Sequence, residues 1–235
     1  MGTAPVTATG VVAGLALALV VHALLARGLA RRGLTGLRPA DRVTLARAWL
    51  TCGVAALTVG GHGGDGVTTP LLVLAGTALA LDAVDGRVAR RTGTASALGA
   101  RFDMEVDALL ILVLSAYVAR ATGWWVLAMG LARYAVLAAT VVAPWLAAGV
   151  APRQWRKAVA AVQGVVLTVA AGGLLSRGWA TSALVVAAAL LGLSFLTEVA
   201  ELWRRRARDI VVVRAAVVAR DGDLRPDTSL TVGAT

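Results

Sequence analysis

Residues 82–107 read DAVDGRVARRTGTASALGARFDMEVD and place five acidic side chains in a chain that is otherwise strongly apolar. An acidic side chain at the centre of a membrane-spanning helix costs about 2.5–3.5 kcal/mol on insertion scales. A cluster of such residues in an apolar chain therefore indicates a function near one face of a membrane. Four of the five acids are regularly spaced: Asp82, Asp85, Asp103 and Asp107.

The composition around this stretch is that of a membrane protein. Of the 235 residues, 58% are hydrophobic, and the mean hydropathy is +0.78. A bilayer core needs about 20 apolar residues for each spanning helix. The richness in Ala, Leu and Val, without alternating polarity, predicts an all-α integral membrane protein rather than a β-barrel. The predicted spans are 10–27, 43–60, 68–84, 104–120, 123–147, 158–175 and 179–202.

The net charge of +10 is unevenly distributed along the chain. Basic residues fill alternate connections between the predicted spans, whereas the other connections carry far fewer, which is the positive-inside pattern. This pattern predicts an N-terminus outside the cell membrane and an acidic motif that faces the cytoplasm. Anionic lipids of the inner leaflet account for the basic bias, so a nucleic-acid partner is not expected.

The four regularly spaced acids form two pairs on consecutive helices. Asp82 and Asp85 are three residues apart, and Asp103 and Asp107 are four apart, so each pair shares one helix face. Since the connection between the two helices is short, all four carboxylates are expected to converge. Glu105 lies about 200° around the helix from Asp103. We therefore interpret Glu105 as a solvated or headgroup-facing charge outside the site.

Converging carboxylates repel one another unless positive charge lies between them. Hard divalent cations with oxygen ligands meet this need, and Mg²⁺ binds through a few carboxylates together with substrate phosphates. Two such ions about 4 Å apart activate a phosphoryl group for displacement. Gly86 would allow a phosphate to approach the backbone, and the arginines that follow it could bind a diphosphate. These features predict phosphoryl transfer at the membrane surface.

The pattern D-x2-D-G-x2-A-R-x8-G-x3-D-x3-D resembles the signature of the CDP-alcohol phosphotransferase (phosphatidyltransferase) family of membrane enzymes. Its eight fixed positions are all met here, by Asp82, Asp85, Gly86, Ala89, Arg90, Gly99, Asp103 and Asp107. A second segment, PADRVTLAR at residues 39–47, is similar to the opening of the family's first core helix. Thr44 and Arg47 match that segment, whereas Asp41 stands where the family usually has Asn.

The resemblance implies a core of six transmembrane helices, preceded here by one additional helix. The expected organisation is an N-terminal extension with one helix over residues 1–38, the six-helix domain over 39–208 and a cytoplasmic tail over 209–235. We expect the tail to fray. The resemblance also implies a homodimer.

The resemblance further implies an enzyme of phospholipid biosynthesis that releases CMP when an alcohol attacks a CDP-linked donor such as CDP-diacylglycerol. The cofactor would be Mg²⁺ or Mn²⁺, as two ions. Asp82, Asp85 and Asp103 would bind metal, and Asp107 would be a ligand or the base that removes the hydroxyl proton. The residues expected to contact the CDP part of the donor are Gly86, Ala89, Arg90, Gly99, Thr44 and Arg47.

The acceptor alcohol is less well defined by the sequence. Arg133 lies inside a predicted span, where it either meets the acceptor or pairs with an acid. Arg153, Arg156 and Lys157 begin the next helix. They either set topology or bind a phosphorylated acceptor, such as glycerol 3-phosphate or inositol phosphate. A lipid acceptor such as phosphatidylglycerol, giving cardiolipin, is the alternative.

A membrane transporter with a divalent-cation site is the competing function from another class. Transporters of this kind place acids near the midplane of the bilayer, on interrupted helices of matched halves. In this sequence the acids lie at helix ends, and no internal symmetry is evident. The enzyme interpretation is therefore favoured.

Overall fold

The computed structural model describes residues 7–34, 36–61, 68–92, 96–148 and 154–223; for residues 68, 85–92, 147, 148, 154, 156 and 209–223 it describes the backbone alone. The described residues form seven α-helices and two short 3₁₀ helices, and each α-helix overlaps one of the predicted spans. The prediction of an all-α membrane protein is confirmed. The elements are α1 (Ala8–Ala30), α2 (Pro39–Gly60), α3 (Thr68–Thr92), α4 (Ala97–Thr122), η2 (Trp124–Val126), α5 (Leu127–Val142), η3 (Pro144–Ala148), α6 (Gln154–Ala171) and α7 (Arg177–Asp223).

Four of these segments are long and apolar enough to cross a membrane: Ala8–Ala30, Pro39–Gly60, Trp124–Val142 and Arg177–Arg208. Shorter apolar helical stretches cover Thr69–Val84 and Lys157–Ala171. Large apolar side chains such as Leu19, Val142 and Leu196 are exposed on the surface, as expected for helices that face lipid. The chain is therefore an integral membrane protein.

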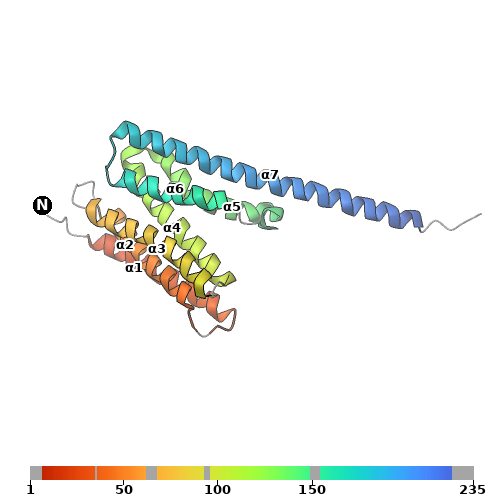
Figure 1. Cartoon of the computed structure of the whole chain (residues 1–235), viewed down its shortest axis with the longest axis horizontal. Helices are drawn as coiled ribbons and strands as arrows, with labels where there is room; N and C mark the ends of the chain where they lie inside the picture. Colours follow the sequence, from red (N-terminus) through yellow and green to blue (C-terminus); the bar gives the residue numbers. More distant parts are fainter. Residues whose placement is uncertain (1–6, 35, 62–67, 93–95, 149–153, 224–235) are drawn as a thin grey trace, which may run out of the picture.

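The additional N-terminal helix packs closely on α2 through small residues. A Cβ atom at Gly10 would overlap the carbonyl oxygen of Ala56, and one at Gly14 would lie 2.9 Å from the Ala56 Cβ. Gly10 and Gly14 are four residues apart, a spacing that allows two membrane helices to approach closely. In Figure 1, α1 and α2 lie side by side with α3 at one side of the molecule.

Helices α2, α3, α4 and α6 surround a common interior, because α2 and α6 each pack on both α3 and α4. The apolar core fills one half of this four-helix ring. It includes Val54 of α2, Leu71 of α3, Leu114 of α4 and Leu167 of α6, all of which are fully buried. Residues Leu184 and Ala187 of α7 close the core.

The predicted span 123–147 is divided into three elements. Helix α5 ends at Val142, and a short 3₁₀ helix follows from Pro144. Proline lacks an amide hydrogen and disfavours the helical conformation in the residue before it, which explains the break. The hydropathy pattern did not reveal this interruption.

Helix α7 continues far beyond the predicted span that ends at residue 202. It runs to Asp223 and projects past the bundle (Figure 1). The expectation that the tail frays from residue 209 is therefore wrong for residues 209–223. Between residues 193 and 221 the chain has no glycine or proline that would end the helix. The helix ends beside Gly222 and shortly before Pro226.

Candidate functional site

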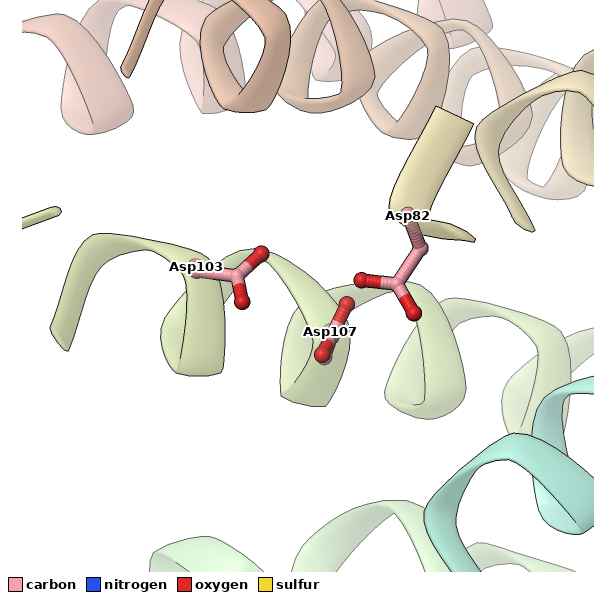
Figure 2. Close-up of side chains that lie close together, drawn as sticks. All are labelled: Asp82, Asp103 and Asp107. Carbon is pink, nitrogen blue, oxygen red and sulfur yellow. The ribbon is translucent and has the colours of Figure 1, made fainter. Parts of the chain in front are cut away.

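Three of the four predicted acids lie together. Asp82 comes from α3, and Asp103 and Asp107 lie one turn apart on α4. Their carboxylates face one another in Figure 2. One carboxylate oxygen from each residue lies within 4.8 Å of the other two, and all three side chains are partly buried. The expected convergence is thus present for these three residues.

Arg47 of α2 lies at the centre of this carboxylate cluster. Its side chain is 1% exposed, and Nη1 lies 3.0 Å from Oδ1 of Asp82. Nη1 also donates a hydrogen bond to Asp103, and Nη2 donates one to Asp107. Nε donates to the carbonyl oxygen of Ala78 at 3.3 Å. A planar guanidinium group with five donors is suited to bridge several carboxylates in this way.

The net formal charge of the cluster is negative. Three carboxylates and one guanidinium leave a formal charge of −2. Like charges at this separation disfavour ionisation unless a cation offsets them. The cluster therefore has the oxygen donors and the residual charge that suit a hard divalent cation such as Mg²⁺ or Mn²⁺. Asp82, Asp103 and Asp107 would hold it.

Thr44 lies one turn before Arg47 on α2 and is buried. Its hydroxyl donates a hydrogen bond to the carbonyl oxygen of Ala40 at 3.3 Å. Thr44 and Arg47, the two α2 residues of the predicted donor site, therefore share one helix face. The contacts of Arg47 show that this face is turned toward the carboxylates.

Gly99 packs against Asp41 rather than open space. A Cβ atom at Gly99 would overlap the Asp41 carboxylate. Asp41 is 6% exposed, and its Oδ2 accepts a hydrogen bond from the backbone amide of Arg38 at 3.2 Å, so it caps the first turn of α2. Ser96 caps α4 in the same region, since its hydroxyl accepts from the Gly99 amide at 2.9 Å. Asp41, which departs from the family pattern, thus stabilises a helix start.

Arg133 of α5 pairs with Glu105 of α4. Its Nη2 lies 2.5 Å from Oε1 of Glu105. Of the two roles considered for Arg133, pairing with an acid is the one observed. Glu105 lies outside the carboxylate cluster as predicted, but it is ion-paired and is not a solitary solvated charge. Among the described residues, Nε of Arg133 is buried without a hydrogen-bond partner.

Several predicted site residues lie outside the described side chains. The backbones of Asp85, Gly86, Ala89 and Arg90 continue α3, and that of Arg156 belongs to α6. Lys157 is exposed near the start of α6. Arg153 lies outside the described residues.

A comparison with protein families matches a large part of the chain. The model for the CDP-alcohol phosphatidyltransferase family matches residues 37–200, which is more than half of the chain. The chain belongs to this family. Searches of curated proteins and of solved structures gave no match. The matched segment contains α2 to α6 and most of the membrane part of α7, and α1 precedes it.

Family membership identifies the general reaction. A CDP-alcohol phosphatidyltransferase moves a phosphatidyl group from a CDP-linked donor to an alcohol in phospholipid synthesis, and such enzymes generally depend on a divalent metal. The carboxylate cluster of this phosphatidyltransferase provides oxygen ligands of the required type.

Sequence reasoning underestimated two residues. Arg47 was one of several donor-binding candidates, and only the fold shows that it contacts three carboxylates from two other helices. Gln163 of α6 was assigned no role, yet it is 2% exposed in the interior of the phosphatidyltransferase. A long polar side chain in the middle of an apolar helix is a signal that could have identified it.

Proposed function

We propose that this phosphatidyltransferase transfers a phosphatidyl group from CDP-diacylglycerol to a phosphorylated polyol, such as glycerol 3-phosphate or inositol phosphate, at the cytoplasmic face of the cell membrane. The observation that carries the proposal is the cluster formed by Asp82, Asp103 and Asp107 around the buried Arg47. The cluster lies outside the apolar core of the four-helix ring. In the proposed reaction, the soluble nucleotide and the lipid would meet there.

In the proposed reaction, the acceptor hydroxyl oxygen attacks the phosphorus that carries the diacylglycerol group. A new phosphorus–oxygen bond forms, the bond to CMP breaks, and CMP leaves with the bonding electron pair. The hydroxyl proton passes to the Asp107 carboxylate. Proton removal by a positioned carboxylate contributes about 10²–10⁴-fold to the rate.

Asp82, Asp85 and Asp103 are the proposed metal ligands, with Asp107 as a further ligand or as the base. A divalent cation bound there would neutralise the diphosphate and stabilise both the attacking and the leaving oxygen. Arg47 contributes a fixed and buried positive charge beside the reacting phosphorus, while the carboxylates around it remain partly exposed to solvent. Thr44, Gly86, Ala89, Arg90 and Gly99 complete the proposed donor site.

The preference for a phosphorylated acceptor depends on the basic start of α6. Lys157 is exposed there, and Arg153 and Arg156 are its neighbours in the sequence. A second phosphate on the acceptor would give these cations a partner.

The test uses the purified full chain in lipid nanodiscs with CDP-diacylglycerol and Mg²⁺. CMP release is followed with glycerol 3-phosphate, inositol phosphate, phosphatidylglycerol and serine as separate acceptors. We expect release with a phosphorylated polyol and a loss of about 10²–10⁴-fold in kcat for Asp107→Asn. The matched control is Glu201→Gln, an acid on α7 that pairs with Arg205 away from the cluster.

Two results would contradict the proposal. The reaction class fails if no alcohol elicits CMP and Asp107→Asn behaves as the wild type does. The acceptor assignment fails if phosphatidylglycerol alone supports CMP release, which would indicate a cardiolipin-type synthase.

A further inference from the structure

Gln163 of α6 has an unsatisfied hydrogen-bond donor in the interior of the protein. Its side chain is 2% exposed, and within the described part of the chain no acceptor lies in hydrogen-bond reach of Nε2. Burying an amide donor without a partner is destabilising. Such a residue in a native fold calls for an explanation, and an absent ligand is one of the standard ones.

The position of Gln163 on α6 is that of an inward-facing residue. Val159, Gln163, Leu167 and Ala171 are all buried, and their spacing of four residues places them on one face of the helix. Leu167 and Ala171 belong to the apolar core. Gln163 therefore points into the four-helix ring, one turn before the core begins.

The depth of Gln163 can be read from the packing of α6 on α3. A Cβ atom at Gly164 would lie 2.7 Å from Cδ2 of Leu79, and one at Gly172 would lie 2.7 Å from Cδ2 of Leu72. This antiparallel alignment places Gln163 opposite residues 80 and 81. Gln163 is thus within about two residues, or roughly 3 Å along the helix axis, of Asp82.

At the level of Asp82 along the helix axis, each of the four helices of the ring contributes a polar side chain. Arg47 lies on α2, Asp82 on α3 and Asp107 on α4, and each is followed toward the core by a buried apolar residue of its own helix. Gln163 is the contribution of α6. In contrast to the other three, which are joined by ion pairs, its Nε2 is left available to a ligand.

We propose that Gln163 binds the acceptor alcohol, with Nε2 donating a hydrogen bond to an acceptor oxygen beside the carboxylate cluster. Two aspects of the position of Gln163 favour binding of the acceptor over binding of the donor. Gln163 lies on α6, whereas the proposed donor contacts lie on α2, α3 and the start of α4. It also shares α6 with Lys157 of the basic start. This inference rests on the proposed function and assigns to it a specificity-determining residue.

The test compares Gln163→Leu with the wild type by kinetics and by thermal unfolding. Leucine has a similar size and no donor. We expect KM for the acceptor, measured with glycerol 3-phosphate and inositol phosphate, to rise about five- to tenfold, while KM for CDP-diacylglycerol is unchanged. The melting temperature without substrates should not fall, because within the described residues Nε2 has no partner to lose.

The matched control is Thr168→Val, a buried polar residue of the same helix. Its hydroxyl bonds to the carbonyl oxygen of Gly164 at 2.7 Å, away from the cluster. This variant should leave both KM values unchanged. A Gln163→Leu variant that melts at a lower temperature than the wild type, or that raises KM for the donor instead, would overturn the inference.

The second readout does not depend on turnover. Each acceptor is added to the CDP-diacylglycerol-loaded protein in Ca²⁺, and the rise in melting temperature is measured. We expect a rise in the wild type that Gln163→Leu reduces. An equal rise in both proteins, or none in either, contradicts the role of Gln163. Failure of CMP release with Mg²⁺, by contrast, contradicts the proposed function alone.

Discussion

Arg47 of α2 is ion-paired to Asp107 of α4, a residue 60 positions later in the chain. The same guanidinium contacts Asp82 of α3 and Asp103 of α4, so one buried cation joins three helices. Removing one partner of a buried pair is usually more destabilising than the pair is stabilising, because the remaining charge is left without compensation.

The first prediction concerns this central arginine. We expect Arg47→Met to lower the free energy of unfolding by about 1–3 kcal/mol in metal-free buffer, because three partly exposed carboxylates lose their shared hydrogen-bond donor. Mg²⁺ should then raise the melting temperature of Arg47→Met more than that of the wild type, because the divalent ion replaces the missing positive charge. Thermal unfolding with and without Mg²⁺ measures both effects. Equal responses of the two proteins to Mg²⁺ would contradict the replacement of the arginine charge by the ion.

The second prediction concerns removal of the metal. EDTA should abolish CMP release, and Mg²⁺ or Mn²⁺ should restore it, since oxygen ligands suit both ions. Asp103→Asn should raise the Mg²⁺ concentration needed for half-maximal activity by about tenfold or more. Glu105→Gln provides the comparison, because Glu105 lies on the same helix but pairs with Arg133. A similar shift in both variants would argue against a site confined to the cluster.

The third prediction concerns the contact between Gly99 and Asp41. Gly99→Ala should destabilise the protein by about 1–3 kcal/mol, because the new methyl group would overlap the Asp41 carboxylate. Asp41→Ala should relieve part of this cost, so the two substitutions should not be additive. The control is Gly76→Ala on α3, where a Cβ would meet nothing within 4 Å and should stabilise the helix slightly. Additive effects of the Gly99 and Asp41 substitutions would contradict the contact.

The fourth prediction concerns the packing of α1 on α2. Gly10→Val should lower the melting temperature by several degrees, since its side chain would overlap the carbonyl oxygen of Ala56. Ala16→Val, at an exposed position of the same helix, should leave the melting temperature nearly unchanged. If both variants melt together with the wild type, the close approach of α1 to α2 is not a source of stability.

The helices could be predicted from the sequence because the membrane imposes a simple rule of length and apolarity. Each predicted span overlaps an α-helix. Their ends were less predictable. Pro144 divides one span, and α7 extends to Asp223 because no glycine or proline interrupts residues 193–221. Hydropathy reports contact with lipid, whereas helix length depends on backbone preference and on the positions of glycine and proline.

The acids of the site could also be predicted from the sequence, since the spacing of Asp103 and Asp107 places both on one face of a helix. The residues that pair with these acids could not be predicted in this way. The contact of Arg47 with Asp82 depends on how α2 packs against α3, and that packing arises from side chains spread along both helices. The same holds for the pairing of Arg133 with Glu105. Sequence spacing describes one helix at a time, and these contacts join two.

The buried guanidinium also bears on how the protein is made. A group of unneutralised carboxylates would resist leaving water during insertion into the bilayer. With Arg47 bonded to Asp82, Asp103 and Asp107, the folded chain supplies part of the counter-charge itself. A divalent ion bound at the cluster would therefore have to offset only the formal charge of −2 that Arg47 leaves, and not the whole charge of the three carboxylates.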